Sequence, residues 1–428
     1  MMHSTTMDLD SVYAYLFSLR RFGVKWGLGP IAHVMRQLGS PQRTFQSVHI
    51  AGTNGKGSTA AMTEAILRAH GVHCGLFVSP HLERFNERIQ VNGNMITDLD
   101  VTELVQRVRD TGIKLSFFEM TTAICFLYFA LCNVDIAVIE VGLGGRLDAT
   151  QWIHPCASAL TSLGADHALA LTTDPLRVAW EKASIAAPGV PFVLPPNLAP
   201  DTLRVVLNTL VARGARAVQP GVDWDFVPVE GGTRVRWLFG TDSEMEFAVP
   251  LVGAHQAANC AVALTLARLA LGHPLTVKNP FVGFSWPGRL EYIDGVYLDG
   301  GHNPAALEHL VRTLIDQKIA PLPVMVGFMA DKDVRHSLRI LSQAASGFIC
   351  TQVDAGERVL PAQQLAQIVE KLHLPLIACE PDLARALVFA PRPALVAGSF
   401  YLVGRARSLL RLGVPNTHSC LSDPTVLG

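Results

Sequence analysis

Along the first half of the chain, short runs of apolar residues alternate with longer segments whose apolar positions recur at helical spacing. The short runs are typical of buried strands, and the longer segments, such as residues 117–132, are typical of helices. This alternation predicts a parallel sheet with helices on both faces. Residues 8–40 are expected to be helical, with a break at residues 23–30, where glycines and a proline cluster. The expected strands are residues 48–51, 74–79, 135–141, 157–162 and 191–194.

The pattern changes twice in the second half of the chain. Residues 222–252 contain three short strand-like runs, which predict an antiparallel meander. A second alternating series begins near residue 291, after a segment rich in proline and glycine at residues 284–289. We therefore predict two α/β domains with a ligand cleft between them: residues 1–286, with a mainly parallel sheet, and a smaller Rossmann-like domain of residues 287–428. The second series predicts strands at residues 296–299, 323–327, 347–351, 376–379 and 394–398, and helices at residues 304–315, 335–345 and 361–372.

The glycine-rich segment of residues 52–58, Gly-Thr-Asn-Gly-Lys-Gly-Ser, lies between an expected strand and an expected helix. In that position backbone N–H groups can converge on a phosphate, and the helix N-terminus and a lysine add positive charge. The spacing differs from the common G-x-x-x-x-G-K-[ST] pattern, because Gly57 stands between Lys56 and Ser58. An ordinary glycine-rich turn is the alternative, but it does not account for Lys56 and Ser58 together. We therefore expect nucleotide binding here.

The composition of the 428 residues is that of a compact and rather apolar globular protein, with 49% hydrophobic and 17% charged residues. The formal net charge of −1 gives no reason to expect a nucleic acid or an acidic membrane surface as a partner. The cysteines include no C-x-x-C pair, which fits thiols in a reducing cytosol better than disulfides or a zinc site. The apolar stretch of residues 123–131 is too short for a membrane span, and no signal peptide is apparent. We expect a cytoplasmic monomer.

Polar residues that could carry chemistry follow several of the expected strands. Glu140 ends a buried strand and precedes a glycine cluster, so it is a candidate magnesium ligand, although a carboxylate that caps a turn is the alternative. His167 follows the strand of residues 157–162 at the same end of the sheet, where a structural histidine is equally consistent. Lys182 by itself is typical of a solvent-exposed helix residue. Residues 299–304, Asp-Gly-Gly-His-Asn-Pro, end one strand of the second series and open a helix.

Five segments together resemble one known family. They are residues 48–58, 79–89, 139–150, 287–289 and 299–304, and they stand in the family's order along nearly the whole chain. On these motifs the chain is similar to folylpolyglutamate synthase and dihydrofolate synthase, which belong to the Mur ligase superfamily of ATP-dependent amide-forming enzymes. The resemblance implies a Mur-ligase-type ATPase domain that contains the phosphate loop, followed by a smaller C-terminal glutamate-ligase domain.

The resemblance also implies roles for individual residues. The implied ATP contacts are Gly55, Lys56, Gly57, Ser58, Asn259, Arg289 and Asp299. The implied ligands of two Mg²⁺ ions are Ser58, Ser79, Glu140 and His167. The implied pterin-site residues are Lys25, Trp26, Gly27, Leu28, Ser116, Phe117, Phe118, Glu119, Leu147, Asp148 and Ala149. Lys56, Lys182 and His302 would act in catalysis, with Lys182 carbamylated so that a cation becomes a carboxylate-like group. No organic redox cofactor is implied.

The chain departs from the family pattern close to these residues. Gln151 stands where asparagine is usual, and Gly301 stands where alanine is usual. His167 is followed by Ala-Leu-Ala-Leu-Thr where a Leu-Gly pair is usual, and Ser184 stands where glycine is usual two residues after Lys182. Every implied ligand remains in place. The departures therefore affect the expected loop geometry and not the expected reaction.

The reaction implied by the resemblance is the ATP-dependent addition of L-glutamate to a folate, to dihydropteroate, or to both, through an acyl phosphate. Lys56, His302 and two Mg²⁺ would offset the charge that develops during the reaction. One alternative is a muramyl-peptide ligase, which would carry a UDP-sugar domain ahead of the phosphate loop, where this chain has only 51 residues. The other is a phosphate-loop NTPase that serves as a switch, which would need no nucleotide contacts as far downstream as Arg289 and Asp299. The sequence leaves the choice of pterin and the glutamate chain length open.

Overall fold

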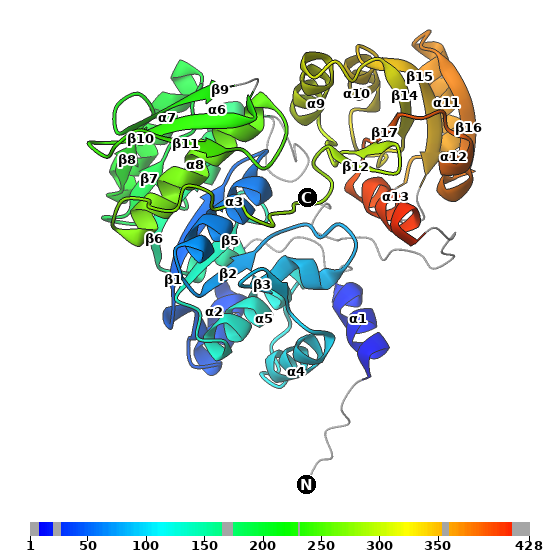
Figure 1. The fold of residues 1–428 in the computed structure, drawn as a ribbon. Coiled ribbons are helices and arrows are strands. Elements are labelled where there is room, and N and C mark those ends of the chain that lie inside the picture. Colours follow the sequence, from blue (N-terminus) through cyan, green and yellow to red (C-terminus); the bar gives the residue numbers. More distant parts are fainter. Residues whose placement is uncertain (1–7, 20–26, 165–173, 230–231, 353–358, 413–428) are drawn as a thin grey trace.

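A sheet of eight strands and a sheet of six strands form two lobes, each with its own covering of helices (Figure 1). The computed structural model describes residues 8–19, 27–164, 174–229, 232–352 and 359–412 of the chain. A small sheet of three strands packs on the first lobe. We call the residues before 287 the N-terminal part and the others the C-terminal part.

The eight-stranded sheet is parallel at its centre and antiparallel at one edge. Its strands, in sheet order, are β4 (Asn94–Met95), β3 (Ile89–Val91), β2 (Cys74–Phe77), β5 (Ile136–Glu140), β1 (Gln46–Ala51), β6 (Pro155–Leu160), β7 (Pro191–Val193) and β8 (Arg216–Val218). β1 and β5 are buried along almost their whole length, because helices cover both faces of the sheet. The sequence did not predict β3, β4 and β8, since strands of two or three residues are too short to show a clear period.

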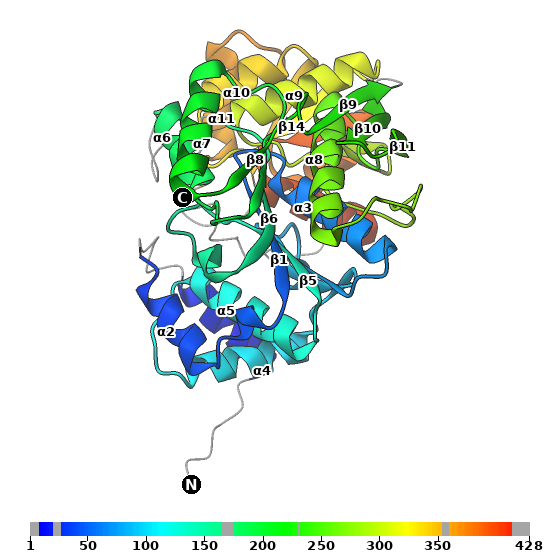
Figure 2. The same cartoon turned by 90° about the vertical axis from the view of Figure 1, so that its left-hand side faces the viewer.

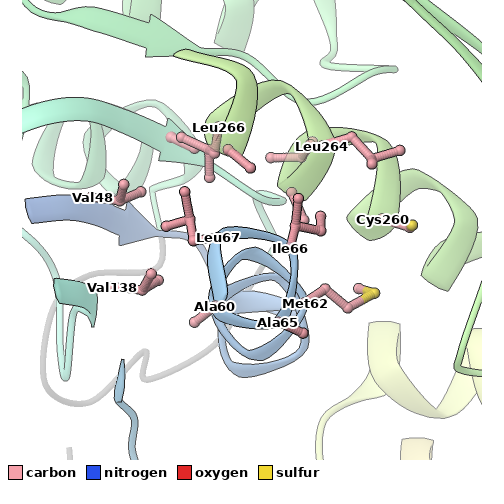
Figure 3. Packing of buried hydrophobic residues seen from close by; sticks show 14 of the residues in the cluster. Val48, Ala60, Met62, Ala65, Ile66, Leu67, Val138, Cys260, Leu264 and Leu266 are labelled. Carbon is pink, nitrogen blue, oxygen red and sulfur yellow. The ribbon is translucent and has the colours of Figure 1, made fainter. Parts of the chain in front are cut away.

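Helix α3 (Lys56–Ala69) fills the space between this sheet and helix α8 (Ala254–Leu271). Figure 3 shows Val48 and Val138 on the strands facing α3, with Leu264 of α8 beyond it. α6 and α7 cover the other side of the sheet (Figure 2). The remaining helices of the N-terminal part pack in a second apolar cluster. The bounds are α1 (Leu9–Ser18), α2 (Gly29–Gln37), α4 (Asp98–Arg109), α5 (Phe117–Leu131), α6 (Pro175–Ala183) and α7 (Pro200–Arg213).

The predicted meander is present as three antiparallel strands, β9 (Trp224–Val229), β10 (Arg234–Phe239) and β11 (Met245–Ala248). Its apolar face packs on α8, and Nε1 of Trp237 donates a hydrogen bond to Oγ1 of Thr265 at 3.0 Å. This bond satisfies two buried polar groups that would otherwise destabilise the contact. The meander therefore fixes α8, which carries one wall of the cleft described below.

The six-stranded sheet forms the C-terminal part. Its strands, in sheet order, are β12 (Glu291–Ile293), β13 (Val296–Leu298), β17 (Ala394–Ala397), β14 (Leu322–Val326), β15 (Ala345–Gln352) and β16 (Leu376–Asp382). All neighbours pair in parallel except β12 with β13. Apolar residues of α9 (Pro304–Asp316), α10 (Val334–Leu341) and α11 (Ala362–Lys371) cover one face, and those of α12 (Leu383–Phe389) and α13 (Phe400–Leu412) cover the other. The predicted α/β fold is thus confirmed, while the domain boundary at residue 287 stays a prediction.

An ion-pair cluster joins the two parts. Arg407 of α13 is buried between two carboxylates, because it pairs with Glu83 of the N-terminal part and its Nε lies 2.9 Å from Oε2 of Glu291. Oγ of Ser408 donates a second hydrogen bond to Glu83, at 2.6 Å. Hydrogen-bonded charges of this kind are well ordered, and losing one partner leaves the other charge buried without compensation.

Two further contacts bring the backbones of the parts together. Asn54 of the phosphate loop and Asn303 at the start of α9 exchange hydrogen bonds of 3.2 and 2.9 Å through their side-chain amides. α13 approaches the segment after β2 so closely that a Cβ atom on Gly404 would lie 2.0 Å from the carbonyl oxygen of Leu82. The absence of a side chain at Gly404 is therefore a condition for this arrangement. Within the described residues, no helix is long and apolar enough to cross a membrane.

We predict that Gly404→Ala destabilises the protein, because the added methyl group overlaps a backbone carbonyl that cannot rotate away. Overpacking of this kind costs about 1–3 kcal/mol. The midpoint of urea or thermal unfolding should fall accordingly. Arg405→Ala, on the same helix, is the control and should leave the midpoint nearly unchanged. Equal stability of Gly404→Ala and the wild type would contradict the close approach of α13 and Leu82.

Candidate functional site

The phosphate loop joins β1 to α3, and two of its glycines lie where no side chain fits. Gly52 has a φ of 153° and Gly55 a φ of 85°, which are conformations that favour glycine. A Cβ atom on Gly52 would lie 2.0 Å from Oγ1 of Thr161, and one on Gly55 would lie 2.5 Å from Oδ1 of Asn259. The loop backbone is therefore pressed against the segment that follows β6 on one side and against α8 on the other.

Hydrogen bonds hold the loop in this position. The hydroxyls of Thr161 and Ser162 donate to the carbonyl of Asn54 at 2.7 and 2.9 Å. Nζ of the buried Lys182 donates to the carbonyl of Gly52 at 2.9 Å. α3 begins at Lys56 without a side-chain cap, so its first backbone N–H groups are available to an anion. The local structure is that of a preorganised phosphate site.

Glu140 is a buried carboxylate at the end of β5, next to this loop. Its Oε2 accepts a hydrogen bond from the amide of Ser79 at 2.9 Å, and its Oε1 lies 3.9 Å from Nζ of Lys56. Burial raises the pKa of Glu140, while the charge of Lys56, the Ser79 amide and the charge of Arg289 act in the opposite direction. The structure thus brings Lys56, Ser79 and Glu140 together, as the motifs predicted.

The oxygen atoms around Glu140 fit a hard divalent cation. A Cβ atom on Gly57 would lie 3.4 Å from Oε2 of Glu140, which places the first turn of α3 close to the carboxylate. The hydroxyls of Ser58 and Ser79 make no hydrogen bond within the described residues, so both can ligate a cation. Among the residues that the structure describes, no group of three or more His, Cys, Asp or Glu side chains is placed to hold a metal ion. His167 lies outside the described residues.

The C-terminal part contributes a second polar cluster. Asp299 follows β13 and accepts hydrogen bonds from the amides of Leu290 at 3.0 Å and Gly301 at 2.8 Å. Burial raises the pKa of Asp299, and the neighbouring charge of Arg289 lowers it. Arg289 lies 4.7 Å from the ring centroid of Phe400, and the ring of His302 packs edge-on against the same phenyl group at 5.6 Å. Phe400 therefore orients two of the predicted site residues.

A single cleft brings these groups together. From the N-terminal part it is lined by Asn54, Gly55, Ser58, Val252, His255, Gln256 and Asn259. From the C-terminal part it is lined by Arg289, Leu290, Asp299, Gly300, Gly301, His302, Ala306, His309, Leu310, Thr313 and Phe400. Five of the predicted ATP contacts, Gly55, Ser58, Asn259, Arg289 and Asp299, thus share one cavity although they are far apart in sequence.

Comparisons with known proteins agree with this geometry. Residues 288–403 match the family model described as Mur ligase, glutamate ligase domain. A Haloferax volcanii protein named probable bifunctional folylpolyglutamate synthase/dihydropteroate synthase is 34% identical to the chain; the match covers 97% of this chain and 52% of that protein. The folylpolyglutamate synthase of Lacticaseibacillus casei is 33% identical, with 94% of this chain and 99% of that protein covered. The chain belongs to the folylpolyglutamate synthase/dihydrofolate synthase family.

A solved structure of another member supports the same assignment. The bifunctional folylpolyglutamate synthase/dihydrofolate synthase of Yersinia pestis, complexed with AMPPNP and Mn ion, superposes with a TM-score of 0.82 at 28% identity, covering 97% of this chain and 100% of that one. The resemblance that the motifs predicted is confirmed. The chain spans about half the length of the Haloferax protein and nearly all of the Lacticaseibacillus enzyme.

The segments that the folylpolyglutamate synthase motifs assign to the pterin lie on the far side of β5 from α3. Leu28, Phe117, Phe118 and Ala149 pack in or against one apolar cluster. Phe118 lies so close to Gly142 that a Cβ atom there would be 2.4 Å from the ring. Three of these segments, residues 27–28, 116–119 and 147–149, are therefore brought together. Lys25 and Trp26 lie outside the described residues.

Two acidic residues of these segments have local structural partners. Oε2 of Glu119 accepts hydrogen bonds from the amide and hydroxyl of Ser116, which forms a capping box at the start of α5. Asp148 accepts from the amide and hydroxyl of Thr150, at 3.0 and 2.5 Å, and from the amide of Leu143. The hydrogen bonds of Glu119 therefore fix the start of α5, and those of Asp148 fix the loop after β5.

Sequence reasoning misplaced Lys182 and passed over several residues. Taken alone, Lys182 was expected to be solvent-exposed, but it is buried, because α6 packs its last turn against the phosphate loop. Phe400 was not singled out, since a lone phenylalanine gives no signal of its partners. Two departures from the family pattern meet in space, because Nε2 of Gln151 donates to the carbonyl of Ser184 at 3.1 Å. The longer side chain thus reaches the altered loop.

We predict that Lys56→Ala weakens ADP binding by about tenfold or more, because a hydrogen bond to a charged group contributes about 1.5–3 kcal/mol. Isothermal titration calorimetry with ADP measures the loss, and circular dichroism should show an unchanged fold. Lys114→Ala, which removes an exposed lysine, is the matched control and should bind ADP normally. Normal ADP affinity of Lys56→Ala would contradict the phosphate-loop assignment.

Proposed function

We propose that this chain is an ATP-dependent ligase that joins L-glutamate to a folate, to dihydropteroate, or to both. The observation that carries the proposal is the cleft, in which the phosphate loop of the N-terminal part faces Arg289, Asp299 and His302 of the C-terminal part. A switch-type NTPase needs no such second wall. The Lacticaseibacillus relative is a folylpolyglutamate synthase, and the Yersinia relative binds an ATP analogue, which supports the same activity here.

In the proposed reaction the substrate carboxylate attacks the γ-phosphoryl group of ATP, which gives an acyl phosphate and ADP. The amino group of L-glutamate then attacks the acyl carbon, and phosphate leaves from the tetrahedral intermediate. No nucleophilic side chain is needed. Lys56 would face the β- and γ-phosphates and His302 the transferring group, so the protein acts mainly by positioning and by preorganised charge.

The proposed metal site contains two Mg²⁺ ions held by Ser58, Ser79, Glu140 and His167. When bound, Mg²⁺ neutralises phosphate charge and polarises the reacting oxygens. Glu140 fits this role because its carboxylate is buried beside Lys56, at 3.9 Å, and has only one backbone donor among the described residues. Lys56 supplies one nearby cation, and a bound Mg²⁺ would compensate the buried carboxylate further.

The proposed pterin site lies around Leu28, Phe118 and Ala149. Oε1 of Glu119 is buried there and has no hydrogen-bond partner within the described residues. A buried carboxylate oxygen without a donor costs free energy, which the N–H groups of a pterin ring would recover. We also propose a cytoplasmic protein, because the seven cysteines in the described part of the chain are all free thiols, as in a reducing compartment. The proposal that it is a monomer rests on the family resemblance alone.

The purified chain should convert ATP, Mg²⁺, L-glutamate and either dihydropteroate or a reduced folate to a product heavier by one or more glutamyl residues, measured by mass spectrometry. We predict that Glu140→Gln lowers this rate by about a thousandfold, a loss typical of a preorganised electrostatic contact. Glu308→Gln, an exposed acid, is the control. Absence of product with both pterins would overturn the proposed function. A rate for Glu140→Gln within a fewfold of wild type, at the same Mg²⁺ dependence, would remove Glu140 from the metal site.

Lys182 is proposed to be carbamylated. The neutral amine would add to CO₂ and release a proton, which gives a carbamate whose two oxygens share one negative charge and suit a hard cation. An unmodified ammonium has three donors and no lone pair, so it cannot ligate Mg²⁺. Nζ of Lys182 lies 2.9 Å from the carbonyl oxygen of Gly52, so the side chain reaches the phosphate loop.

We predict that Lys182→Ala is nearly inactive and that acetate or formate restores part of the activity, since a small carboxylate can occupy the space of the carbamate. The product assay with and without the carboxylate at about 0.1 M measures the rescue. This concentration is roughly a hundredfold above the upper end of typical KM values for enzyme substrates. A bicarbonate-dependent ¹³C resonance of the wild type is the direct test. Full activity of Lys182→Ala would contradict the proposal. The combination of an inactive variant that no carboxylate restores and a wild type without the ¹³C resonance would contradict it as well.

A further inference from the structure

Arg146 stands in the glycine-rich loop after β5, and the motifs assign it no role. It contacts the last turn of α6, which is the turn that carries Lys182. Nε of Arg146 donates to Oε2 of Glu181 at 3.2 Å, and its guanidinium carbon lies 5.0 Å from the ring centroid of Trp180. The backbone amide of Arg146 donates to the carbonyl of Glu181, also at 3.2 Å. Arg146 therefore contacts both of the residues that precede Lys182 in the helix.

The segment that follows β5 packs directly on the same turn. A Cβ atom on Gly145 would lie 2.7 Å from the carbonyl oxygen of Glu181 and 3.2 Å from Cα of Lys182. On the other side of Lys182, Nε2 of Gln151 donates to the carbonyl of Ser184 at 3.1 Å. These bonds supply donors to carbonyl groups at the end of α6, which have none inside the helix. The end of α6 is thus held before and after Lys182 by one segment.

The carboxylate of Glu181 depends on Arg146 for its charge balance. Glu181 is buried, and Arg146 is the only cation among the described residues that pairs with it. The second carboxylate oxygen of Glu181, Oε1, is buried and has no hydrogen-bond partner within those residues. Removing one partner of such a pair leaves a charge without compensation, which is strongly destabilising at a buried position. The Arg146 side chain therefore stabilises the local conformation in which Glu181 faces the loop.

We propose that Arg146 is a positioning residue, which holds the last turn of α6 through Glu181 and Trp180 so that Lys182 stays at the phosphate loop. Nζ of Lys182 reaches the carbonyl of Gly52 at 2.9 Å, and a small shift of the turn would break this contact. The inference rests on the proposed function, because it takes Lys182 to be carbamylated at this place. Arg146 itself acts through α6 and contacts none of the substrates.

Four variants of the full chain test the inference: Arg146→Met, Arg146→Lys, Glu181→Gln and the double variant Arg146→Met/Glu181→Gln. The product assay gives kcat and the KM values, and the bicarbonate-dependent ¹³C resonance reports the carbamate of Lys182. Removing a residue that orients the groups of a reactive site typically lowers activity by about tenfold to a hundredfold, so kcat of Arg146→Met should fall by that factor. Its KM values should change little, and its carbamate resonance should weaken at a fixed bicarbonate concentration.

The other variants separate charge from packing. Arg146→Lys keeps a cation beside Glu181, so it should restore most of the kcat and of the resonance. The double variant should lose less kcat than Arg146→Met, because it leaves no buried carboxylate without a partner. The Arg146 side chain is 38% exposed, so its replacement opens no cavity in the core and the thermal midpoint should stay well above the assay temperature. Arg177→Ala, which changes an exposed arginine on α6, is the control and should match the wild type.

Several results would overturn this inference and leave the ligase proposal intact. One is an Arg146→Met variant with the kcat or the resonance of the wild type. Another is a raised KM for the pterin or for glutamate at an unchanged resonance, which would make Arg146 a substrate contact. A double variant whose loss is the product of the two single losses would exclude action through Glu181. A wild type that forms product without the resonance would overturn this inference together with the carbamate, and a wild type that forms no product with either pterin would overturn the proposed function as well.

Discussion

The phosphate loop lies in a space that admits no side chain at two of its positions, and the rest of the site is arranged around that constraint. Thr161 occupies the place of a side chain on Gly52, and Asn259 occupies the place of one on Gly55. The loop is therefore held between the end of β6 and α8, two elements that belong to the same apolar cluster as α3. The core fixes the elements, the elements fix the loop, and the loop directs the N-terminus of α3 into the cleft.

Charge in the site is balanced across the two parts of the chain. Glu140 is buried beside Lys56, and Arg289 of the C-terminal part contributes to its electrostatic environment. The charges of Asp299 and Glu140 in turn favour the charged form of Arg289, and Phe400 lies beneath its guanidinium group. Each buried charge thus depends on a partner from another element, because an isolated charge would be strongly destabilising at this depth. The site is electrostatically complete only when both parts contribute.

The sequence predicted the parts of this structure that leave a local signature. Apolar runs located β1, β5 and β14, and glycine spacing located the phosphate loop, because each signal depends on neighbouring residues. Short edge strands such as β12 give no period, and the burial of Lys182 depends on packing between α6 and a loop that precedes it by more than a hundred residues. The stacking of Arg289 and His302 on Phe400 is likewise a long-range contact that no local pattern encodes. Family motifs supplied the roles of residues that the pattern alone left ambiguous.

The segment after β2 connects two features that are separate in function. Ser79, at its start, donates its amide to Glu140, and Glu83, four residues later, is bound by Arg407 and Ser408 of α13. A rotation of the C-terminal part would therefore be transmitted within a few residues to the carboxylate beside the phosphate loop. By thermodynamic reciprocity, any ligand that favours one arrangement of the two parts is itself bound more tightly in that arrangement. A nucleotide that contacts both lobes would then bind most tightly in one relative orientation of the two lobes.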